Sequence, residues 1–261
     1  MRWFEIALVG LTFATGLIWL LDRLFFAKRR AANESLLDDG KDPVLVDYSK
    51  AFFPVLLAVL ILRSFIAEPF RIPSNSMMPT LLTGDFILVN KFAYGLRLPI
   101  NNHKFVDLGA PERGDVVVFR PPHHPDQDWI KRVMGLPGDR IAYRDNTVFI
   151  NGEPLRYEAL GAYRGIGNGI EMTGAEELRE HLADGSHTVL ERLNLPFLDQ
   201  GQGEWVVPEG HYFVMGDNRD NSEDSRYWGY LPERALRGKA FLIWMNFDGD
   251  IDFSRIGSSI P

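Results

Sequence analysis

The chain has 261 residues, 46% hydrophobic and 24% charged, which is the composition of a folded protein and not of a disordered one. Its formal net charge is -7, and residues 1–70 are balanced, so the acidic excess lies in the rest of the chain. An acidic domain repels phosphate, and no basic stripe with interleaved aromatic residues occurs, so we expect no nucleic-acid partner. The absence of cysteine excludes disulfides, thiolate catalysis and cysteine-ligated zinc, but it leaves the compartment open.

Two apolar runs in the first 70 residues are long enough, with their flanks, to cross a bilayer. Residues 6–21 carry no charge and predict a helix over about 4–22. Residues 51–66 predict a second helix over about 51–67, with Pro54 near its start and Arg63 near its end, where a guanidinium can reach the interface. A cleavable signal peptide is the alternative for the first run, and a buried core helix is the alternative for the second.

The charges around these runs predict which way they point. Six Lys/Arg lie between the two runs, whereas only Arg2 precedes the first. The positive-inside rule therefore places residues 23–50 in the cytoplasm. Residues 1–69 are then a membrane anchor in the bilayer, and residues 70–261 are an exported domain that faces the periplasm or the exterior of a bacterial cell.

From residue 86 onward, short apolar runs separated by turn dipeptides predict a mostly β domain. A helix is expected at residues 176–183, because Thr173 and Glu176 have capping-box spacing. Residues 153–204, which include a glycine-rich stretch, are expected to form a looser insertion. The predicted strands are residues 86–89, 116–119, 130–134, 140–143, 147–150, 205–207, 212–215 and 240–245.

Residues 72–81 read Ile-Pro-Ser-Asn-Ser-Met-Met-Pro-Thr-Leu and place Ser74 and Ser76 between two prolines. Prolines fix local backbone angles, so such a loop can hold a hydroxyl and nearby backbone N–H groups in place. The alternative is a Pro/Ser turn that links a membrane helix to the domain.

A lysine lies inside the apolar strand predicted at residues 130–134. Alternation turns Ile130 and Arg132 to one face, and Lys131 to the other face with Trp129 and Val133. Burial would lower the pKa of this lysine toward neutrality, as a lysine general base requires. An exposed strand lysine is the alternative.

Residues 216–229 are dense in short polar side chains and follow the strand predicted at 212–215. A calcium loop of the EF-hand type is excluded, because Arg219 stands where an acid or amide is needed. A buried network of Ser, Asp and Arg that positions other groups is the better interpretation, with a solvated turn as the alternative. Apart from the His123–His124 pair in a proline-rich loop, the six histidines show no metal-ligand spacing. All six are interpreted as surface residues, so we expect no metal and no cofactor.

These segments together resemble the conserved boxes of bacterial type I signal peptidase, also called leader peptidase. The resemblance covers roughly residues 70–139 and 212–245 and leaves residues 153–204 outside. It runs through residues 73–81, 84–89, 113–117, 130–132, 135–139, 216–222 and 224–226. It implies a signal peptidase-like β fold and a membrane-bound serine endopeptidase that removes signal peptides from exported preproteins at A-x-A-like sites.

The resemblance also implies roles for individual residues. Ser76 is the expected nucleophile and Lys131 the expected general base, with the Ser74 hydroxyl and the Ser76 N–H forming the oxyanion hole. Ser222 is expected to hold the lysine amine. The residues expected to support the site are Ser222, Asp224, Arg226 and Arg132, and those expected to contact the substrate are Ile72, Pro73, Ile87, Trp129 and Ile130.

Two other functions are compatible with parts of the sequence. A self-cleaving repressor of the LexA type also uses a Ser/Lys pair, but two apolar segments and the lack of a DNA-binding head argue against it. A catalytically silent, membrane-anchored β domain that binds partners is the alternative from a different class. Loss of activity on changing Ser76 alone would separate an enzyme from a binding module.

Overall fold

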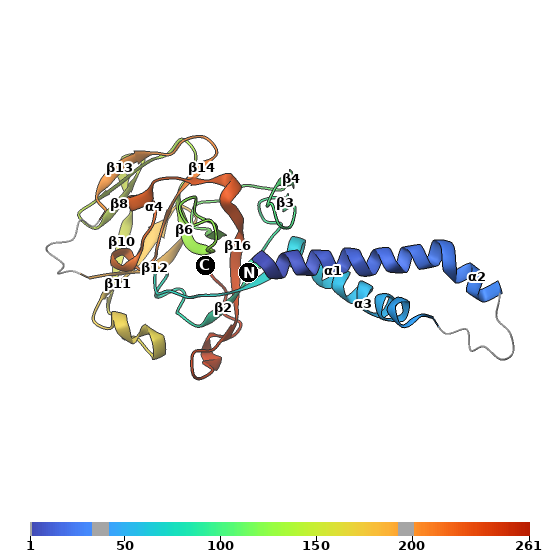
Figure 1. The fold of residues 1–261 in the computed structure, drawn as a ribbon. Helices are drawn as coiled ribbons and strands as arrows, with labels where there is room; N and C mark the ends of the chain where they lie inside the picture. Colours follow the sequence, from blue (N-terminus) through green and yellow to red (C-terminus); the bar gives the residue numbers. More distant parts are fainter. Residues whose placement is uncertain (1, 33–41, 193–200) are drawn as a thin grey trace. The chain divides into compact units, whose positions relative to one another are not determined.

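The computed structural model describes residues 2–32, 42–192 and 201–261, and the chain divides into two compact units (Figure 1). The first unit comprises residues 1–66 with 98–101, and the second comprises residues 67–97 with 102–261. The division after residue 66 lies three residues before the predicted one.

The first unit is helical. Helix α1 (Arg2–Leu21) continues through a π-helical turn (Asp22–Phe26) into α2 (Ala27–Ala32), and α3 (Val44–Ile61) ends in a second π-helical turn (Leu62–Ile66). Helices α1 and α3 pack against each other, with the rings of Trp19 and Phe53 5.4 Å apart. Gly16 permits this approach, because a Cβ there would lie 2.6 Å from the Phe53 ring.

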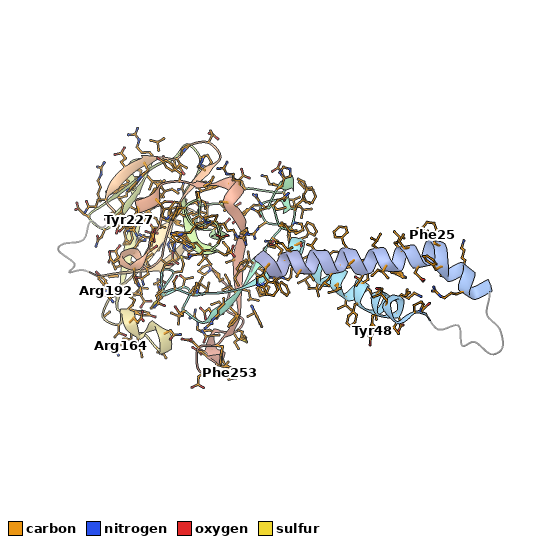
Figure 2. The ribbon with its side chains drawn as sticks, viewed as in Figure 1. Phe25, Tyr48, Arg164, Arg192, Tyr227 and Phe253 are labelled. Carbon is orange, nitrogen blue, oxygen red and sulfur yellow. The ribbon has the colours of Figure 1, made fainter. Side chains whose placement is uncertain are left out.

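Two helical spans, residues 3–26 and 44–66, are long and apolar enough to cross a membrane. Most of their side chains are exposed; Phe25 and Tyr48, for example, project outward from the helices (Figure 2). A helix apolar on all sides needs an apolar surrounding. The second helix begins at Val44, seven residues before the predicted 51, because charged residues such as Asp47 and Lys50 are tolerated in its first turns. The middle of the predicted loop, residues 33–41, lies outside the described residues.

The second unit is mostly β, as predicted, and all of its named sheets are antiparallel. Its main sheet has seven strands, and each of the eight strands predicted from the sequence is present in this unit. In sheet order the seven are β1 (Ala67–Arg71), β2 (Asp85–Asn90), β16 (Leu236–Asn246), β5 (Val116–Phe119), β6 (Trp129–Gly135), β14 (His211–Met215) and β15 (Leu231–Pro232).

Smaller sheets and short helices surround the main sheet (Figure 1). The four-stranded sheet contains β13 (Gly203–Val206), β7 (Arg140–Arg144), β8 (Thr147–Ile150) and β9 (Glu153–Pro154). The three-stranded sheet contains β10 (Arg156–Ala162), β11 (Glu176–Leu182) and β12 (Gly185–Glu191), and β3 (Leu96–Arg97) pairs with β4 (Lys104–Val106). The helical segments are α4 (Ser225–Trp228) and the 3₁₀ turns Gly167–Met172, Arg219–Asn221, Glu233–Ala235 and Phe253–Arg255.

The helix predicted at residues 176–183 is wrong, because this segment is strand β11. It pairs with β10 on one side and β12 on the other, so hydrogen bonds between strands satisfy its backbone. The capping-box spacing and the good helix formers in this segment are local signals, and pairing with two strands outweighs them. The expected loose insertion at residues 153–204 therefore contains a three-stranded sheet, β10–β11–β12, while residues 163–175 form a loop with a 3₁₀ turn. Residues 193–200 lie outside the described residues.

The segment between β1 and β2 is anchored by buried apolar side chains on both sides of Ser76. Ile72 and Met77 belong to the core cluster that also contains Ile87 and Ile130. Met78 faces a second cluster, whose other members are Leu82, Met172, Ala175 and Leu190. The core of the main sheet and the insertion thus hold this segment from two directions.

Candidate active site

Ser76 lies in the segment between β1 and β2 and is 8% exposed. The residues after it, Met77 and Met78, are fully buried, so they fix the backbone on which the serine is presented. The Ser76 carbonyl accepts a hydrogen bond from the backbone N–H of Asn218 at 3.1 Å. Packing and hydrogen bonding therefore hold the serine in place, as its position between two prolines predicts.

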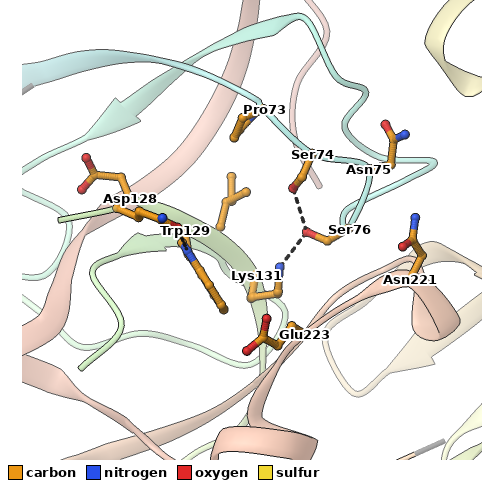
Figure 3. A pocket seen from close by; sticks show the side chains of 11 residues that line it. Pro73, Ser74, Asn75, Ser76, Asp128, Trp129, Lys131, Asn221 and Glu223 are labelled. Atoms are coloured by element: carbon orange, nitrogen blue, oxygen red, sulfur yellow. Dashed lines mark hydrogen bonds between the residues drawn. The ribbon is translucent and has the colours of Figure 1, made fainter. Parts of the chain in front are cut away.

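Lys131 meets this serine from the interior of the main sheet. It lies on β6, between β5 and β14, and is 4% exposed. Its Nζ lies 2.6 Å from Ser76 Oγ, within hydrogen-bond distance (Figure 3). Burial lowers the pKa of the Lys131 amine to about 8, although the carboxylates of Asp224 and Asp217 act in the opposite direction.

Ser74 brings a second hydroxyl to the same place, with its Oγ 3.4 Å from Ser76 Oγ (Figure 3). The three side chains open into a pocket of about 630 Å³. Its walls include Pro73, Trp129 and Ile130, three of the residues expected to contact the substrate. The structure therefore gathers both serines, the lysine and an apolar wall around one open space.

The loop after β14 builds the floor behind Lys131. The guanidinium of Arg226 donates to both carboxylate oxygens of Asp224, each at 2.9 Å, and Asp224 also accepts from the Gly216 N–H at 2.9 Å. Burial alone would raise the pKa of Asp224, but the guanidinium lowers it below its ordinary value. Asp224 therefore remains a carboxylate and fixes the loop.

Ser222 joins this network in a different way from the one expected. Its hydroxyl donates to Asp224 Oδ2 at 2.8 Å, and among the described residues no hydrogen bond joins Ser222 to Lys131. A carboxylate two residues away is a stronger acceptor than its other neighbours, so it takes the hydroxyl proton. Ser222 therefore supports the loop, and its expected contact with the Lys131 amine stays a prediction.

Arg132, next to the lysine on β6, forms a buried ion pair with Asp217. Its Nε and Nη2 donate to the two carboxylate oxygens at 2.9 and 2.8 Å, and both side chains are 1% exposed. Asp217 also accepts from the Thr80 hydroxyl at 2.5 Å. The pair therefore ties β6, the loop after β14 and the Ser76 segment together.

Two residues expected to contact the substrate do not line the pocket. Ile72 is 2% exposed and Ile87 is fully buried, and both pack in the core cluster of the main sheet. On β2 the alternation turns Ile87 inward, between the buried Asp85 and Val89. These isoleucines therefore share a buried cluster with Ile130, which does line the pocket.

Sequence reasoning missed several polar residues of the pocket. The sequence pointed to these residues only by their position, because each lies within a few residues of a predicted site residue or in the polar stretch 216–229. These pocket residues are Asn75, Gln127, Asp128, Asn221 and Glu223.

The interpretation of all six histidines as surface residues is wrong for His187. It is 4% exposed, and its Nε2 lies 3.0 Å from Glu180, which also accepts from Arg219 at 2.7 Å. Burial alone would raise the pKa of Glu180, but Arg219 holds it below its ordinary value. This charge cluster joins β11 and β12 to the 3₁₀ turn Arg219–Asn221; the sequence gives no signal for it, because its members lie on three separate segments.

A serine hydroxyl beside a buried lysine amine, open to a pocket on a β scaffold, has the arrangement of a serine hydrolase that uses lysine in place of histidine. Comparison with known proteins makes this class specific. The family model described as signal peptidase, peptidase S26, matches residues 45–245. The chain is 44% identical to signal peptidase I of Pseudomonas fluorescens, over 97% of this chain and 98% of that protein.

Other relatives agree. Signal peptidase I of Pseudomonas aeruginosa is 41% identical over the same shares of the two chains, and that of Aquifex aeolicus is 39% identical over 74% of this chain and 81% of that protein. A crystal structure of signal peptidase I from Enterococcus faecalis V583 is 33% identical, covering 51% of this chain and 98% of that chain, with a TM-score of 0.32.

The chain belongs to the signal peptidase I family, peptidase S26. It is a serine endopeptidase that removes signal peptides, and its two apolar helices indicate a membrane protein. Membership of this family excludes the two alternative functions, a LexA-type repressor and a catalytically silent binding domain.

Proposed function

We propose that Ser76 is the nucleophile and Lys131 the general base of this endopeptidase. One observation carries the proposal: Lys131 Nζ lies 2.6 Å from Ser76 Oγ, in a buried position that lowers the pKa of the amine to about 8. A serine hydroxyl is a poor nucleophile until a neighbour removes its proton. A neutral amine at hydrogen-bond distance can accept that proton, whereas an ammonium cannot.

The proposed reaction has two halves. As the neutral Lys131 amine takes the hydroxyl proton, Ser76 Oγ attacks the scissile carbonyl, and the resulting ammonium gives the proton to the leaving amine. A water then attacks the acyl-enzyme and gives a proton to Lys131; as the bond between Ser76 Oγ and the acyl carbon breaks, Lys131 returns that proton to Ser76 Oγ, which releases the acid and restores the neutral amine. The Ser74 hydroxyl and the Ser76 N–H are proposed to stabilise the oxyanion. The distance of 3.4 Å between Ser74 Oγ and Ser76 Oγ supports this role, because it puts the Ser74 hydroxyl next to the atom that attacks the carbonyl.

The substrate proposal follows from the walls of the pocket. Pro73, Trp129 and Ile130 bring bulky or rigid surfaces next to the reacting hydroxyl. Such walls favour small side chains, which is what an A-x-A-like site presents. Changing the small residue immediately before the cleavage site of a preprotein to Leu should lower kcat/KM at least tenfold; unchanged cleavage would contradict this proposal.

The orientation in the membrane is also a proposal. The Lys/Arg residues between the two apolar helices support a cytoplasmic position for residues 23–50 and an outward position for the catalytic unit, in the inner membrane of a bacterium. The chain has no cysteine, so a maleimide reagent can label this protein only at a cysteine introduced by substitution. A membrane-impermeant maleimide should label Asn146→Cys in intact spheroplasts and Lys28→Cys only after permeabilisation; the reverse pattern would refute the proposed topology.

The dyad is tested with Ser76→Ala and Lys131→Ala. Each variant should fail to cleave a secretory preprotein while it retains the thermal unfolding transition of the parent. Cleavage is measured by N-terminal sequencing of any product. Asn146→Ala, in the turn between β7 and β8, is the matched control. Turnover within tenfold of the parent in either dyad variant would contradict the mechanism.

A further inference from the structure

Asn218 contacts both peptide groups that flank the reacting serine. Its backbone N–H donates to the carbonyl of Ser76 at 3.1 Å, and its side-chain Nδ2 donates to the carbonyl of Asn75 at 3.0 Å. Asn218 is itself fully buried. One residue of the loop after β14 therefore holds the backbone on both sides of Ser76.

The contact with Asn75 fixes the direction of a particular N–H group. The peptide bond between Asn75 and Ser76 is trans, so its carbonyl and its N–H point in opposite directions across a rigid plane. The carbonyl accepts from the Asn218 amide and also from the backbone N–H of Met78 at 3.2 Å. Because it points at the Asn218 amide, the N–H of Ser76 lies at the opposite edge of the peptide plane and points away from Asn218.

The position of Asn218 is determined by its neighbours. Asp217, the preceding residue, is held by Arg132 and Thr80, and the backbones of Leu190 on β12 and Asn218 form a parallel bridge. The Asn218 carbonyl Oδ1 is buried and has no hydrogen-bond partner among the described residues. Turning the amide would bring that oxygen against the carbonyl of Asn75, so the donor contact fixes the orientation of the side chain.

We propose that Asn218 is the positioning residue of the oxyanion hole: by holding the carbonyl of Asn75, it aims the N–H of Ser76 at the charge that develops on the substrate. Asn218 does not touch substrate and acts only through the peptide plane. The inference rests on the proposed function, in which the Ser76 N–H is an oxyanion donor. A donor must be held in place before the reaction, because reorganising it during the reaction removes part of its effect.

Substitution by a neutral residue of similar size tests this role. Asn218→Leu removes the donor without adding charge near Lys131, and Asn218→Ala serves as a second variant if leucine prevents folding. Cleavage of a preprotein should show kcat lowered about 10- to 100-fold with KM within about twofold, less than the ~10² to 10³ expected for removing a donor outright. The pH at which activity rises should not change, because the amine is untouched.

A peptide aldehyde that ends in alanine gives an independent readout. The Ser76 hydroxyl adds across the aldehyde carbonyl: the Oγ–C bond forms, and the proton passes through Lys131 to the former carbonyl oxygen, which then occupies the oxyanion hole. The inhibition constant should rise in Asn218→Leu by about the factor lost in kcat. Asn246→Leu is the matched control, since this buried asparagine donates to Asp85 at 2.7 Å; it should lose stability and keep kcat.

The outcomes separate the inference from the proposed function. A folded Asn218 variant with kcat within twofold of the parent, or with only KM raised, would overturn the inference while loss of activity in Ser76→Ala still supported the dyad. A displaced pH profile would also overturn it, because Asn218 would then act through Lys131. Full activity in Ser76→Ala would instead refute the proposed function itself.

Discussion

The burial of Lys131 predicts a pH dependence that a histidine-based hydrolase would not share. Burial lowers the pKa of this amine from its ordinary value of 10.5 to about 8, which corresponds to about 3 kcal/mol of destabilisation of the ammonium. Below pH 8 the charged amine cannot accept the proton of Ser76, and at pH 7 about a tenth of the molecules are active. We expect kcat/KM to rise tenfold per pH unit up to about 8 and then to level off.

Replacing Glu223 is a way to change the pKa of Lys131. Its carboxylate faces the pocket, is 62% exposed, and raises the pKa of the lysine through its charge. Glu223→Gln should therefore move the rising limb to lower pH, by a small amount because solvent and salt screen an exposed charge. Glu209→Gln, at an exposed turn before β14, is the control and should leave the limb in place.

The assay is kcat/KM from pH 5 to 10 at constant ionic strength, on a peptide substrate that does not titrate in this range. His123 and His124 are the alternative explanation for a rise of kcat/KM with pH, because both rings contact Trp129 at the wall of the pocket. A limb near pH 6.5 that disappears when both histidines are replaced would refute the lysine assignment.

Four further predictions follow from the site. Ser74→Ala should lower kcat by ~10² to 10³ if its hydroxyl is an oxyanion donor, and an unchanged rate would place the hole elsewhere. Gly216→Ala should abolish activity, since a Cβ there would lie 2.2 Å from Ser222 Oγ and 2.5 Å from the carbonyl oxygen of Ser76; an active, folded variant in a cleavage assay would contradict this packing. Lys131→Met should be inactive yet more stable at pH 7, by up to about 3 kcal/mol in denaturant unfolding. Because the pKa of Lys131 is lowered, the folded state is destabilised fully below pH 8, and this destabilisation is lost as the pH rises toward 10.5. The stability gained in Lys131→Met should therefore shrink between pH 8 and 10.5. A gain that stayed constant with pH would argue against a buried ammonium. Chelator should not inhibit cleavage, because the proposed chemistry uses only side chains and backbone, and inhibition that added zinc or calcium reverses would overturn that chemistry.

The sequence predicted features that depend on local pattern. Strand β5 was predicted with its observed bounds, and Lys131 was placed inside a strand, because short apolar runs bounded by turn residues are visible within a few residues. The segment 176–182 was assigned incorrectly, because its helix-forming residues gave a local signal, whereas pairing with β10 and β12 depends on segments remote in the chain.

The same distinction applies to the candidate site. Ser76 and Lys131 were identified as a pair only through resemblance, since nothing in their local sequences indicates that they meet. The burial of His187 depends on how β12 packs against β11 and the loop after β14, which a single sequence does not encode in any local pattern. Ile72 was assigned to the pocket through resemblance, whereas its neighbour Pro73 lines it and Ile72 is buried; a shift of one residue along an extended segment turns the side chain to the other face.

The attachment of β12 has a consequence for where the chain can change in length. At one end of β12, the Leu190 N–H donates to Asp217 at 2.9 Å, and the Arg192 N–H donates to Asp220 at 2.6 Å. An added or deleted residue there would slide both bonds out of register with the loop that holds Ser76. At the other end, the turn at Asp184 between β11 and β12 is exposed, and the described residues include no such hydrogen bond there. An epitope or a fluorescent domain inserted at this turn should therefore leave peptidase activity intact.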